Sequence, residues 1–311
     1  MESKRLKPMY KDPIYDGATD PVVIFNEKEN CWYMFYTQRR ASDITIGVSN
    51  IHGTKIGVAS SANGANWVYR GTLQGLDFEK GHNTFWAPEI IFAEGQYHMY
   101  VSYITGIPTT WDHERHIIHY TSDNLWDWTY HGSVPLSSQR VIDACVYKIN
   151  KNTYKMWYKD ENNNSYSYAA VSHDLFNWEV VGPEITDVSH EGPNVFELGG
   201  IKWMITDFWD GLGVYRTENF ISWERQKENI LNKPGIHEED KGIGHHADVV
   251  VNGDEAYIFY FVHPNQEDDS SDALTKQYLK SRTTVLAARL TVENGILCCD
   301  RDEEFEMSLG E

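Results

Sequence analysis

Residues 20–36 read Asp-Pro-Val-Val-Ile-Phe-Asn-Glu-Lys-Glu-Asn-Cys-Trp-Tyr-Met-Phe-Tyr, an apolar run, a polar turn and an aromatic run. Both runs have the length and the β-branched or aromatic composition of strands, and the turn between them is typical of a hairpin. The same order recurs from Glu89, Asp143, Glu191 and His246. In four of these five cycles a third strand follows and ends in a turn and a tryptophan: Trp67, Trp128, Trp178 and Trp223.

The spacing of the cycles predicts the fold. They begin roughly 50–70 residues apart, which is the length of four short strands with their turns and of one propeller blade. No stretch shows a convincing helical period over twelve residues. We therefore predict an all-β protein, a single five-bladed β-propeller over residues 1–311, with blades at about 18–71, 86–132, 141–182, 190–226 and 243–300. A β-sandwich with coincidental tryptophans is the alternative.

Charge and composition exclude several classes of partner. The 311 residues include 46 acidic and 27 basic side chains, a formal net charge of −19. Nucleic acids and anionic membrane surfaces are bound through basic patches, so we expect neither as a partner. Neutral ligands such as sugars remain compatible with this charge.

No targeting or cross-linking signal is visible. No apolar run reaches the roughly 18 residues of a membrane span, and no apolar segment follows the basic N-terminus. We expect a cytoplasmic protein, or a periplasmic or secreted one if a leader had been removed. Four cysteines without zinc spacing predict reduced thiols rather than a disulfide framework.

The residues that open the five cycles are the candidate site. The first strand of each propeller blade lines the central channel, so side chains at the start of these strands should meet at one mouth of it. We predict that four acids hold the corresponding position in their cycles and that a histidine pair holds it in the fifth: Asp20, Glu89, Asp143, Glu191 and His245/His246. Like charges held this close repel each other, so such a ring needs a cation or a chemical task.

Paired carboxyl groups are the machinery of glycoside hydrolysis. One must be protonated so that it can donate a proton to the leaving oxygen, and the other must be ionised to activate water or to attack the sugar. A third carboxylate nearby raises the pKa of the acid and keeps it protonated. Asp20, Asp143 and Glu191 supply these three groups from three cycles.

The motifs around these acids resemble glycoside hydrolase family 43, a family of inverting enzymes on five-bladed propellers. The resemblance runs from Asp20 to about Arg282. It rests on Thr19-Asp20-Pro21, Ile142-Asp143-Ala144 and Glu191-Gly192-Pro193, although the family usually has proline where Ala144 stands. It implies that Asp20 is the general base, that Glu191 is the general acid, and that Asp143 tunes the acid and orients the substrate.

Further segments suggest substrate contacts. Trp86-Ala-Pro-Glu89 resembles the wall of the family's sugar pocket, and His245 resembles a channel histidine beside water or calcium. The resemblance thus implies no required cofactor, with a structural calcium at His245 as the one metal to consider. Arg282 resembles a late arginine that reaches the pocket; surface ion pairing is the alternative for it and for Arg39. The residues expected at the substrate are Trp86, Glu89, His190, Trp209, His245, Arg282 and Arg39, with core packing as the alternative for the two tryptophans.

The predicted function is an exo-acting, inverting α-L-arabinofuranosidase or β-D-xylosidase that acts on an oligosaccharide or polysaccharide. Phe35–Arg40 and the pair His190-Glu191 also resemble glycoside hydrolase family 117, which cleaves α-linked 3,6-anhydro-galactose and in which a histidine has been considered as the acid. Neighbours on a strand face opposite ways, so only one of this pair should reach the sugar, and we favour Glu191. Retaining fructosidases fit the motifs less well. A non-catalytic carbohydrate-binding propeller and a protein-interaction scaffold are the alternatives from other classes.

Overall fold

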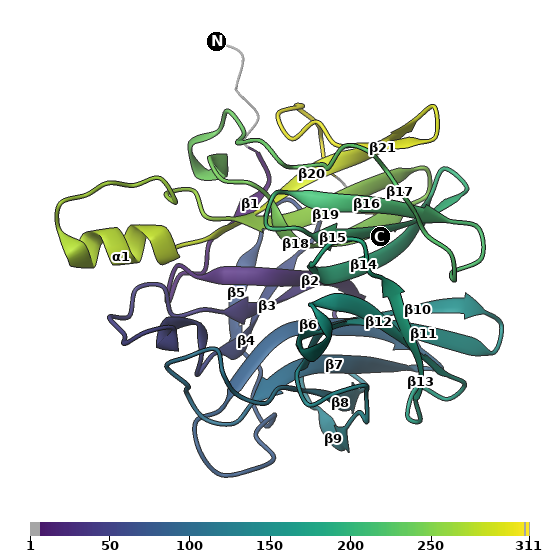
Figure 1. The fold of residues 1–311 in the computed structure, drawn as a ribbon. Coiled ribbons are helices and arrows are strands. Elements are labelled where there is room, and N and C mark those ends of the chain that lie inside the picture. The colour runs from purple at the N-terminus through teal and green to yellow at the C-terminus, as the bar shows by residue number, and fades with distance from the viewer. Residues whose placement is uncertain (1–6, 308, 311) are drawn as a thin grey trace.

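The computed structural model describes residues 7–307, 309 and 310, and its five antiparallel sheets form a five-bladed β-propeller around a central axis (Figure 1). This confirms the predicted fold. In each of the first four blades the strands follow one another from the axis outward in sequence order. The connections between successive strands are therefore short, as expected for a repeat of one supersecondary unit.

The strands of blades one and two cover residues 18–133. Blade one consists of β2 (Ala18–Asn26), β3 (Cys31–Gln38), β4 (Lys55–Ser61) and β5 (Val68–Thr72). Blade two consists of β6 (Thr84–Ala93), β7 (Gln96–Ile104), β8 (His116–Ser122) and β9 (Thr129–Ser133).

Blades three and four repeat this plan. Blade three consists of β10 (Val141–Asn150), β11 (Thr153–Asp160), β12 (Tyr166–Ser172) and β13 (Glu179–Ile185). Blade four consists of β14 (Glu191–Leu198), β15 (Ile201–Asp207), β16 (Leu212–Thr217) and β17 (Glu224–Arg225). Short 3-10 turns lie at Ser49–Ile51, Glu161–Asn163 and Glu238–Asp240.

The fifth blade joins the two ends of the chain. It contains β18 (His245–Asn252), β19 (Glu255–Val262) and β20 (Thr284–Glu293), and β21 (Ile296–Cys298) pairs with β20. The early strand β1 (Met9–Tyr10) also pairs with β20, with Tyr10 opposite Val285. A strand of two residues is too short to show a period, so the sequence pattern gave no sign of this closure.

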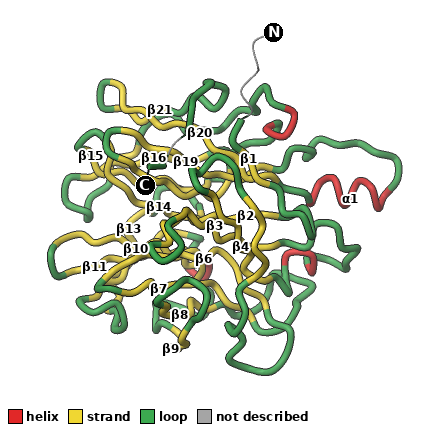
Figure 2. The backbone as a smooth tube through the Cα atoms, turned by 180° about the vertical axis from the view of Figure 1, so that it is seen from behind, coloured by secondary structure: helices red, strands yellow, loops and turns green. Residues whose placement is uncertain are grey.

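One α-helix lies outside the blades. Helix α1 (Ala273–Ser281) belongs to the connection between β19 and β20 and projects from the side of the propeller (Figures 1 and 2). Asp272 caps it by accepting a hydrogen bond of 2.7 Å from the backbone N–H of Thr275. The helix was not predicted, because nine residues are fewer than a periodicity test can resolve. No helix in the described part of the chain is long and apolar enough to cross a membrane.

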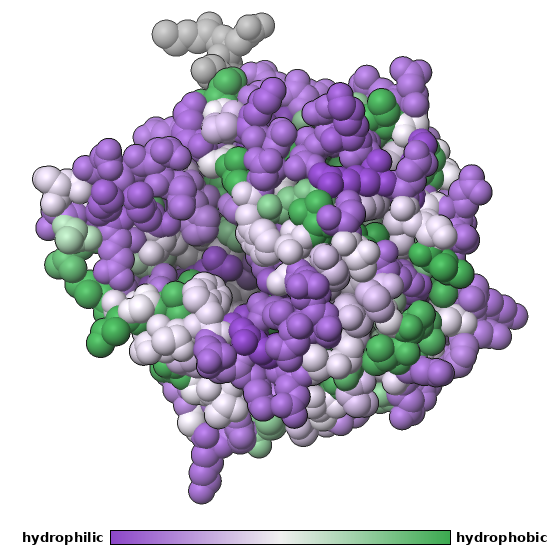
Figure 3. All heavy atoms as spheres, in the orientation of Figure 1, coloured by the Kyte–Doolittle hydropathy of each residue, from purple (hydrophilic) through white to green (hydrophobic). Residues whose placement is uncertain are grey.

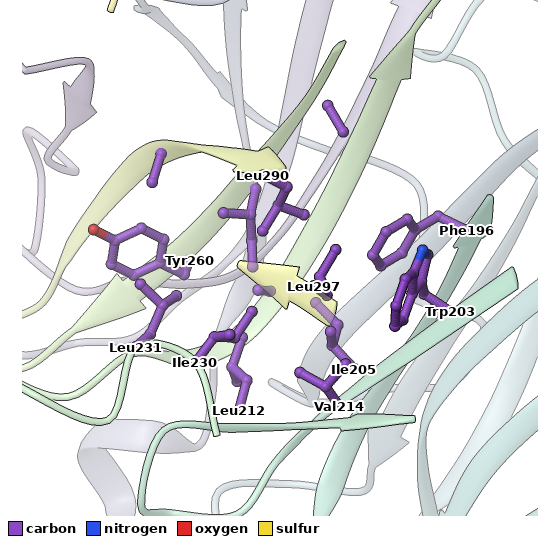
Figure 4. Packing of buried hydrophobic residues seen from close by; sticks show 14 of the residues in the cluster. Phe196, Trp203, Ile205, Leu212, Val214, Ile230, Leu231, Tyr260, Leu290 and Leu297 are labelled. Atoms are coloured by element: carbon purple, nitrogen blue, oxygen red, sulfur yellow. The ribbon is translucent and has the colours of Figure 1, made fainter. Parts of the chain in front are cut away.

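Apolar packing between neighbouring blades forms most of the core. The cluster in Figure 4 joins blade four, through Phe196, Trp203 and Leu212, to blade five, through Tyr260 and Leu290. Full burial of such side chains contributes about 1.5–3 kcal/mol each. The face shown in Figure 3, by contrast, is mostly hydrophilic, with hydrophobic residues scattered over it. The four recurring tryptophans, Trp67, Trp128, Trp178 and Trp223, belong to or pack against these inter-blade clusters.

A β-bulge interrupts the innermost strand of every blade at the same point. In each of the first four blades two residues are left out of the pairing, and in blade five one residue is. The first of two unpaired residues has a left-handed backbone in blades one to four: Asp20, Ala87, Asp143 and Gly192, with φ between 42° and 58°. Because a bulge re-aims a side chain, it can direct one residue per blade toward the channel mouth.

The bulges correct the predicted alignment of the acids. Only Asp20 and Asp143 share the equivalent position. Glu191 lies one residue before it and pairs with Asp207, whereas Glu89 lies two residues after it and pairs with Tyr100. The ring of four equivalent acids was therefore wrong, because sequence similarity alone could not place the extra residues of the bulges.

Side chains from the preceding blade hold the bulges in place. The backbone N–H groups of Ala87 and Asp143 donate to hydroxyl oxygens of Thr37 and Ser102 at 2.8 and 3.0 Å. These partners occupy equivalent positions on the second strand of each blade. Lys159 has this position in blade three and cannot accept a hydrogen bond. The N–H of Gly192 donates to Asp143 instead, at 3.2 Å.

Below the bulges, Glu89 links two blades inside the propeller. Its carboxyl oxygen accepts a hydrogen bond of 2.7 Å from the backbone N–H of Val146. Burial raises the pKa of Glu89 to about 8, and the nearby Asp248 adds to the effect. Glu89 is therefore buried inside the propeller, where it holds two blades together and does not line the pocket.

Replacing Glu89 with glutamine tests this protonation. The folded protein holds the Glu89 proton up to about pH 8, whereas the unfolded chain releases it near 4.5, so the stability of the wild type falls as the pH rises through this window. Glutamine keeps an oxygen acceptor and does not titrate. We expect the free energy of unfolding of Glu89→Gln relative to the wild type to increase between pH 5 and pH 8 in urea titrations. The exposed Glu179→Gln is the control, and an equally flat difference for both variants would contradict the buried, protonated carboxyl.

Candidate active site

A pocket of about 400 Å³ opens at the level of the bulges and contains three of the predicted acids. Asp20, Asp143 and Glu191 reach it from β2, β10 and β14, the innermost strands of blades one, three and four. The structure thus brings together three side chains that are far apart in the sequence. The volume of the pocket is within the range of small-ligand sites.

Asp20 lies among hydrogen-bond donors and cationic groups. Its carboxylate accepts a hydrogen bond of 3.0 Å from the Thr19 hydroxyl and lies 3.8 Å from the Arg39 guanidinium. Nδ1 of His246 is 3.6 Å from the other oxygen. Burial lowers the pKa of His246, but the surrounding carboxylates, first Asp143 and then Asp20, outweigh it and raise the pKa above its usual value.

Glu191 is held as a carboxylate. Lys159 donates to one oxygen at 2.8 Å, and the indole N–H of Trp209 donates to the other at 2.9 Å. Burial opposes the ionised form, but the charge and the hydrogen bond of Lys159 outweigh it, so the pKa of Glu191 lies below its usual value. With both oxygens accepting hydrogen bonds, the unliganded pocket favours an ionised Glu191.

Asp143 has the opposite character. It is almost fully buried, and burial together with the charge of Glu191 raises its pKa, against the opposing effect of His246. Asp143 therefore takes up a proton more readily than Glu191 does. The expectation that Asp143 keeps Glu191 protonated is wrong for this state, because Lys159 stabilises the Glu191 carboxylate.

A cluster of cationic side chains completes the pocket and was not predicted. Arg115, Arg140 and Lys159 line it together with Glu161 and Trp111. The Arg115 guanidinium lies 5.5 and 5.7 Å from the ring centroids of Trp86 and Trp111, and it donates to Glu161 at 2.7 Å. Lys159 pairs with Ile142, next to the blade-three bulge. Its position opposite the Asp143 motif is the signal that could have identified it as a pocket residue. The other side chains come from loops and turns, where the repeat gives no register.

The predicted substrate-contacting residues divide into two groups. Trp86, Trp209 and Arg39 line the pocket. Glu89, His190, His245 and Arg282 lie elsewhere, and Glu89 was described above. Arg282 forms ion pairs with Asp16 at 3.0 Å and with Glu239 at 2.8 Å, the alternative named for it from the sequence.

His190 faces away from the acids. Its ring is fully buried between the Ser167 hydroxyl at 2.7 Å and the backbone carbonyl of Val188 at 2.8 Å. Neighbouring strand residues point to opposite faces, so the exposure of Glu191 to the pocket sends His190 into the blade. The alternative that His190 donates the catalytic proton has no support in this geometry.

His245 borders a second cleft, and the side chains around it do not fit a protein-bound calcium ion. Its Nδ1 lies 3.0 Å from a carboxylate oxygen of Asp207, and its ring stacks on Phe261. Calcium takes six to eight oxygen ligands. Within residues 7–307, 309 and 310, no group of three or more His, Cys, Asp or Glu side chains is placed to hold a metal ion.

The fold and the three carboxyl groups define a propeller glycosidase, and the comparison with known families agrees. The chain belongs to glycosyl hydrolase family 43, whose model matches residues 10–287. This confirms the resemblance found in the motifs and makes the protein a glycosidase that acts on O-glycosyl bonds. No curated protein matches the sequence.

Several solved structures share the fold. A thermostable family-43 glycoside hydrolase is 20% identical, with a TM-score of 0.69 over 97% of this chain and 99% of its own. The α-L-arabinofuranosidase from Lactobacillus brevis is 17% identical, with a TM-score of 0.64 over 92% and 94%. A β-xylosidase/α-arabinofuranosidase from a compost microbial metagenome, solved with xylotriose in a calcium-free form, is 13% identical, with a TM-score of 0.65 over 94% and 97%. At these identities the likeness shows the fold alone.

Removing the Lys159 charge tests the electrostatics of the pocket without an activity assay. In Lys159→Met the Glu191 carboxylate loses its cation and one hydrogen bond, so we expect the pKa of Glu191 to rise. The measurement is the pH titration of the side-chain carboxyl carbon by ¹³C NMR. Lys159→Arg keeps the charge and should keep the pKa low. A Glu191 pKa that is the same in the Met variant and the wild type would show that Lys159 does not hold the carboxylate ionised.

Proposed function

We propose that the protein is an inverting, exo-acting glycosidase that releases α-L-arabinofuranosyl or β-D-xylosyl units from an oligosaccharide or polysaccharide. The observation that carries this proposal is the presence of Asp20, Asp143 and Glu191, from three blades, in one pocket. Glycoside hydrolysis requires a pair of carboxyl groups, one as acid and one as base, and a third nearby can tune the acid. The neighbours named for arabinofuranosidase and xylosidase activity support the sugar class.

In the proposed reaction a water molecule attacks the anomeric carbon while the glycosidic bond breaks. Asp20 takes a proton from the water, and Glu191 gives a proton to the leaving oxygen, so the products gain the elements of water. In the unliganded pocket, however, Lys159 lowers the pKa of Glu191. Substrate binding must therefore weaken the contact between Lys159 and Glu191 so that Glu191 can take up a proton.

The positions of His190, the three acids and the arginines also bear on the alternative functions. The burial of His190 removes the histidine that favoured a family-117-like hydrolase of 3,6-anhydro-galactose. The three acids meet in a pocket, which a non-catalytic binding propeller or a plugged scaffold does not need. The arginines give this pocket donors for sugar hydroxyls; the nearest to a proposed catalytic group is Arg39, beside Asp20.

Amide substitutions of the two proposed catalytic groups test the assignment. We expect Asp20→Asn and Glu191→Gln each to lower kcat by about 10²- to 10⁴-fold, because proton transfer by a positioned side chain contributes about this much. The assay uses α-1,5-arabinobiose and xylobiose, because a sugar leaving group needs the proton of the general acid, with the exposed Asp127→Asn as control. Near wild-type turnover in both pocket variants would overturn the assignment. Saturable sugar binding without hydrolysis by the wild type would favour the non-catalytic alternative.

The stereochemistry of the first product tests inversion. Proton NMR during early hydrolysis should show a sugar whose anomeric configuration is opposite to that of the substrate, because water attacks from the face opposite the leaving group. A first product of retained configuration would instead assign a nucleophile and a covalent intermediate to the pocket.

A further inference from the structure

A second cleft adjoins the catalytic pocket, and no function proposed so far uses it. It has a volume of about 680 Å³ and lies between the segment before β18 and the segment after β19. Its lining includes Lys241, His245, His263, Asn265 and Gln266. Trp209 lines both the cleft and the pocket, so the two cavities share one wall.

Trp209 is held in an unusual conformation at this shared wall. Its backbone has φ of 56°, a left-handed value that is costly for a large side chain, and its side chain is 45% exposed. Asp207 fixes the turn by accepting a hydrogen bond of 2.7 Å from the Trp209 N–H. The indole N–H points to Glu191, and the Lys159 ammonium lies 5.2 Å from the ring centroid. An exposed aromatic ring in such a fixed position is a platform for a ligand.

The position of Glu191 gives the cleft a direction relative to the substrate. A general acid contacts the oxygen of the leaving group, and the Glu191 carboxylate lies against the indole of Trp209. A leaving group that contacts the Glu191 oxygen bonded by the indole therefore also lies next to Trp209. The cleft begins at this same side chain.

The hydrogen-bonding groups of the cleft suit a neutral, hydroxyl-rich ligand. Burial lowers the pKa of His263 to about 3, so its ring is neutral. Its Nδ1 bonds the backbone carbonyl of Lys280 at 3.1 Å, which leaves Nε2 as an acceptor. The side-chain oxygen of Asn265 accepts from Arg282 at 2.8 Å, so the amide nitrogen of Asn265 is the group that can donate to a ligand.

The charged groups of the cleft argue against an anion. The Lys241 ammonium is engaged by the backbone carbonyls of Gly235 and Ile236, each at 3.0 Å. Glu267 and Asp268 also line the cleft and bring negative charge to it. A phosphate or a uronic acid would meet these carboxylates, whereas a neutral sugar would not.

We propose that this cleft is a leaving-group subsite that binds one or more neutral sugar units beyond the scissile bond, against the indole of Trp209. The proposal rests on the glycosidase reaction described above, with Glu191 as its acid. It makes the protein selective for oligosaccharide over small aryl substrates.

The test is to block the cleft and compare long and short substrates. Gln266 is exposed at the cleft wall, so Gln266→Trp adds bulk there without disturbing the core. We expect the ratio of kcat/KM for arabinotriose or xylotriose to that for the matching 4-nitrophenyl glycoside to fall at least tenfold. Asn265→Ala, which removes the proposed donor, should lower the same ratio. Gln74→Trp, at an exposed position in blade one, is the matched control and should leave the ratio unchanged.

The outcomes separate the two proposals. A ratio that stays within twofold of the wild type in both cleft variants would overturn the subsite while leaving the hydrolase intact. A wild-type protein that hydrolyses neither class of substrate would overturn the proposed function and the subsite with it. Thermal melts of each variant show that a changed ratio does not come from partial unfolding.

Discussion

The left-handed bulge in the innermost strands is the constraint on which the site depends. In blades one and three it carries Asp20 and Asp143, and in blade four it displaces the strand just after Glu191. The backbone N–H of a bulge residue has lost its partner within the sheet, and an uncapped donor inside a protein costs about 1–3 kcal/mol. Ser102 of blade two caps Asp143, and Asp143 in turn caps Gly192, the residue after Glu191. The placement of Asp143 and of the strand after Glu191 therefore depends on the preceding blade.

The exception to this pattern is chemically informative. Where blades one and two offer a hydroxyl group, blade three offers Lys159, and Asp143 takes over the task of capping the next bulge. Lys159 is then directed at Glu191, and Asp143 is buried against the bulge. These two contacts move the pKa values of Asp143 and Glu191 in opposite directions. A change in local backbone capping thus sets the electrostatics of the proposed reaction.

The recurring strand order, turns and tryptophans were sufficient to predict the five blades and to bring three of the acids to one mouth. They could not predict the register, because the first halves of the innermost strands are buried on both faces and show no alternation that an extra residue would interrupt. Glu89 was placed in the ring for this reason. Lys159, Arg115 and Glu161 were missed because their positions follow from pairing across a sheet and from loops, neither of which repeats. The strand β1 and the helix α1 were missed because they are too short to show a period. His190 was considered because it precedes Glu191, and Arg282 because it resembles a late arginine of the family. Strand alternation turns His190 into the blade, and ion pairs hold Arg282 away from the pocket.

The proposed reaction requires that carboxyl groups from three blades act on one sugar in one pocket. The decisive measurement is a crystal structure of Asp20→Asn soaked with an uncleaved trisaccharide. We expect the anomeric carbon of the terminal sugar to lie between residue 20 and Glu191, with the next unit against Trp209. A sugar chain bound on another face of the propeller, or in the pocket with its leaving oxygen remote from Glu191, would contradict it.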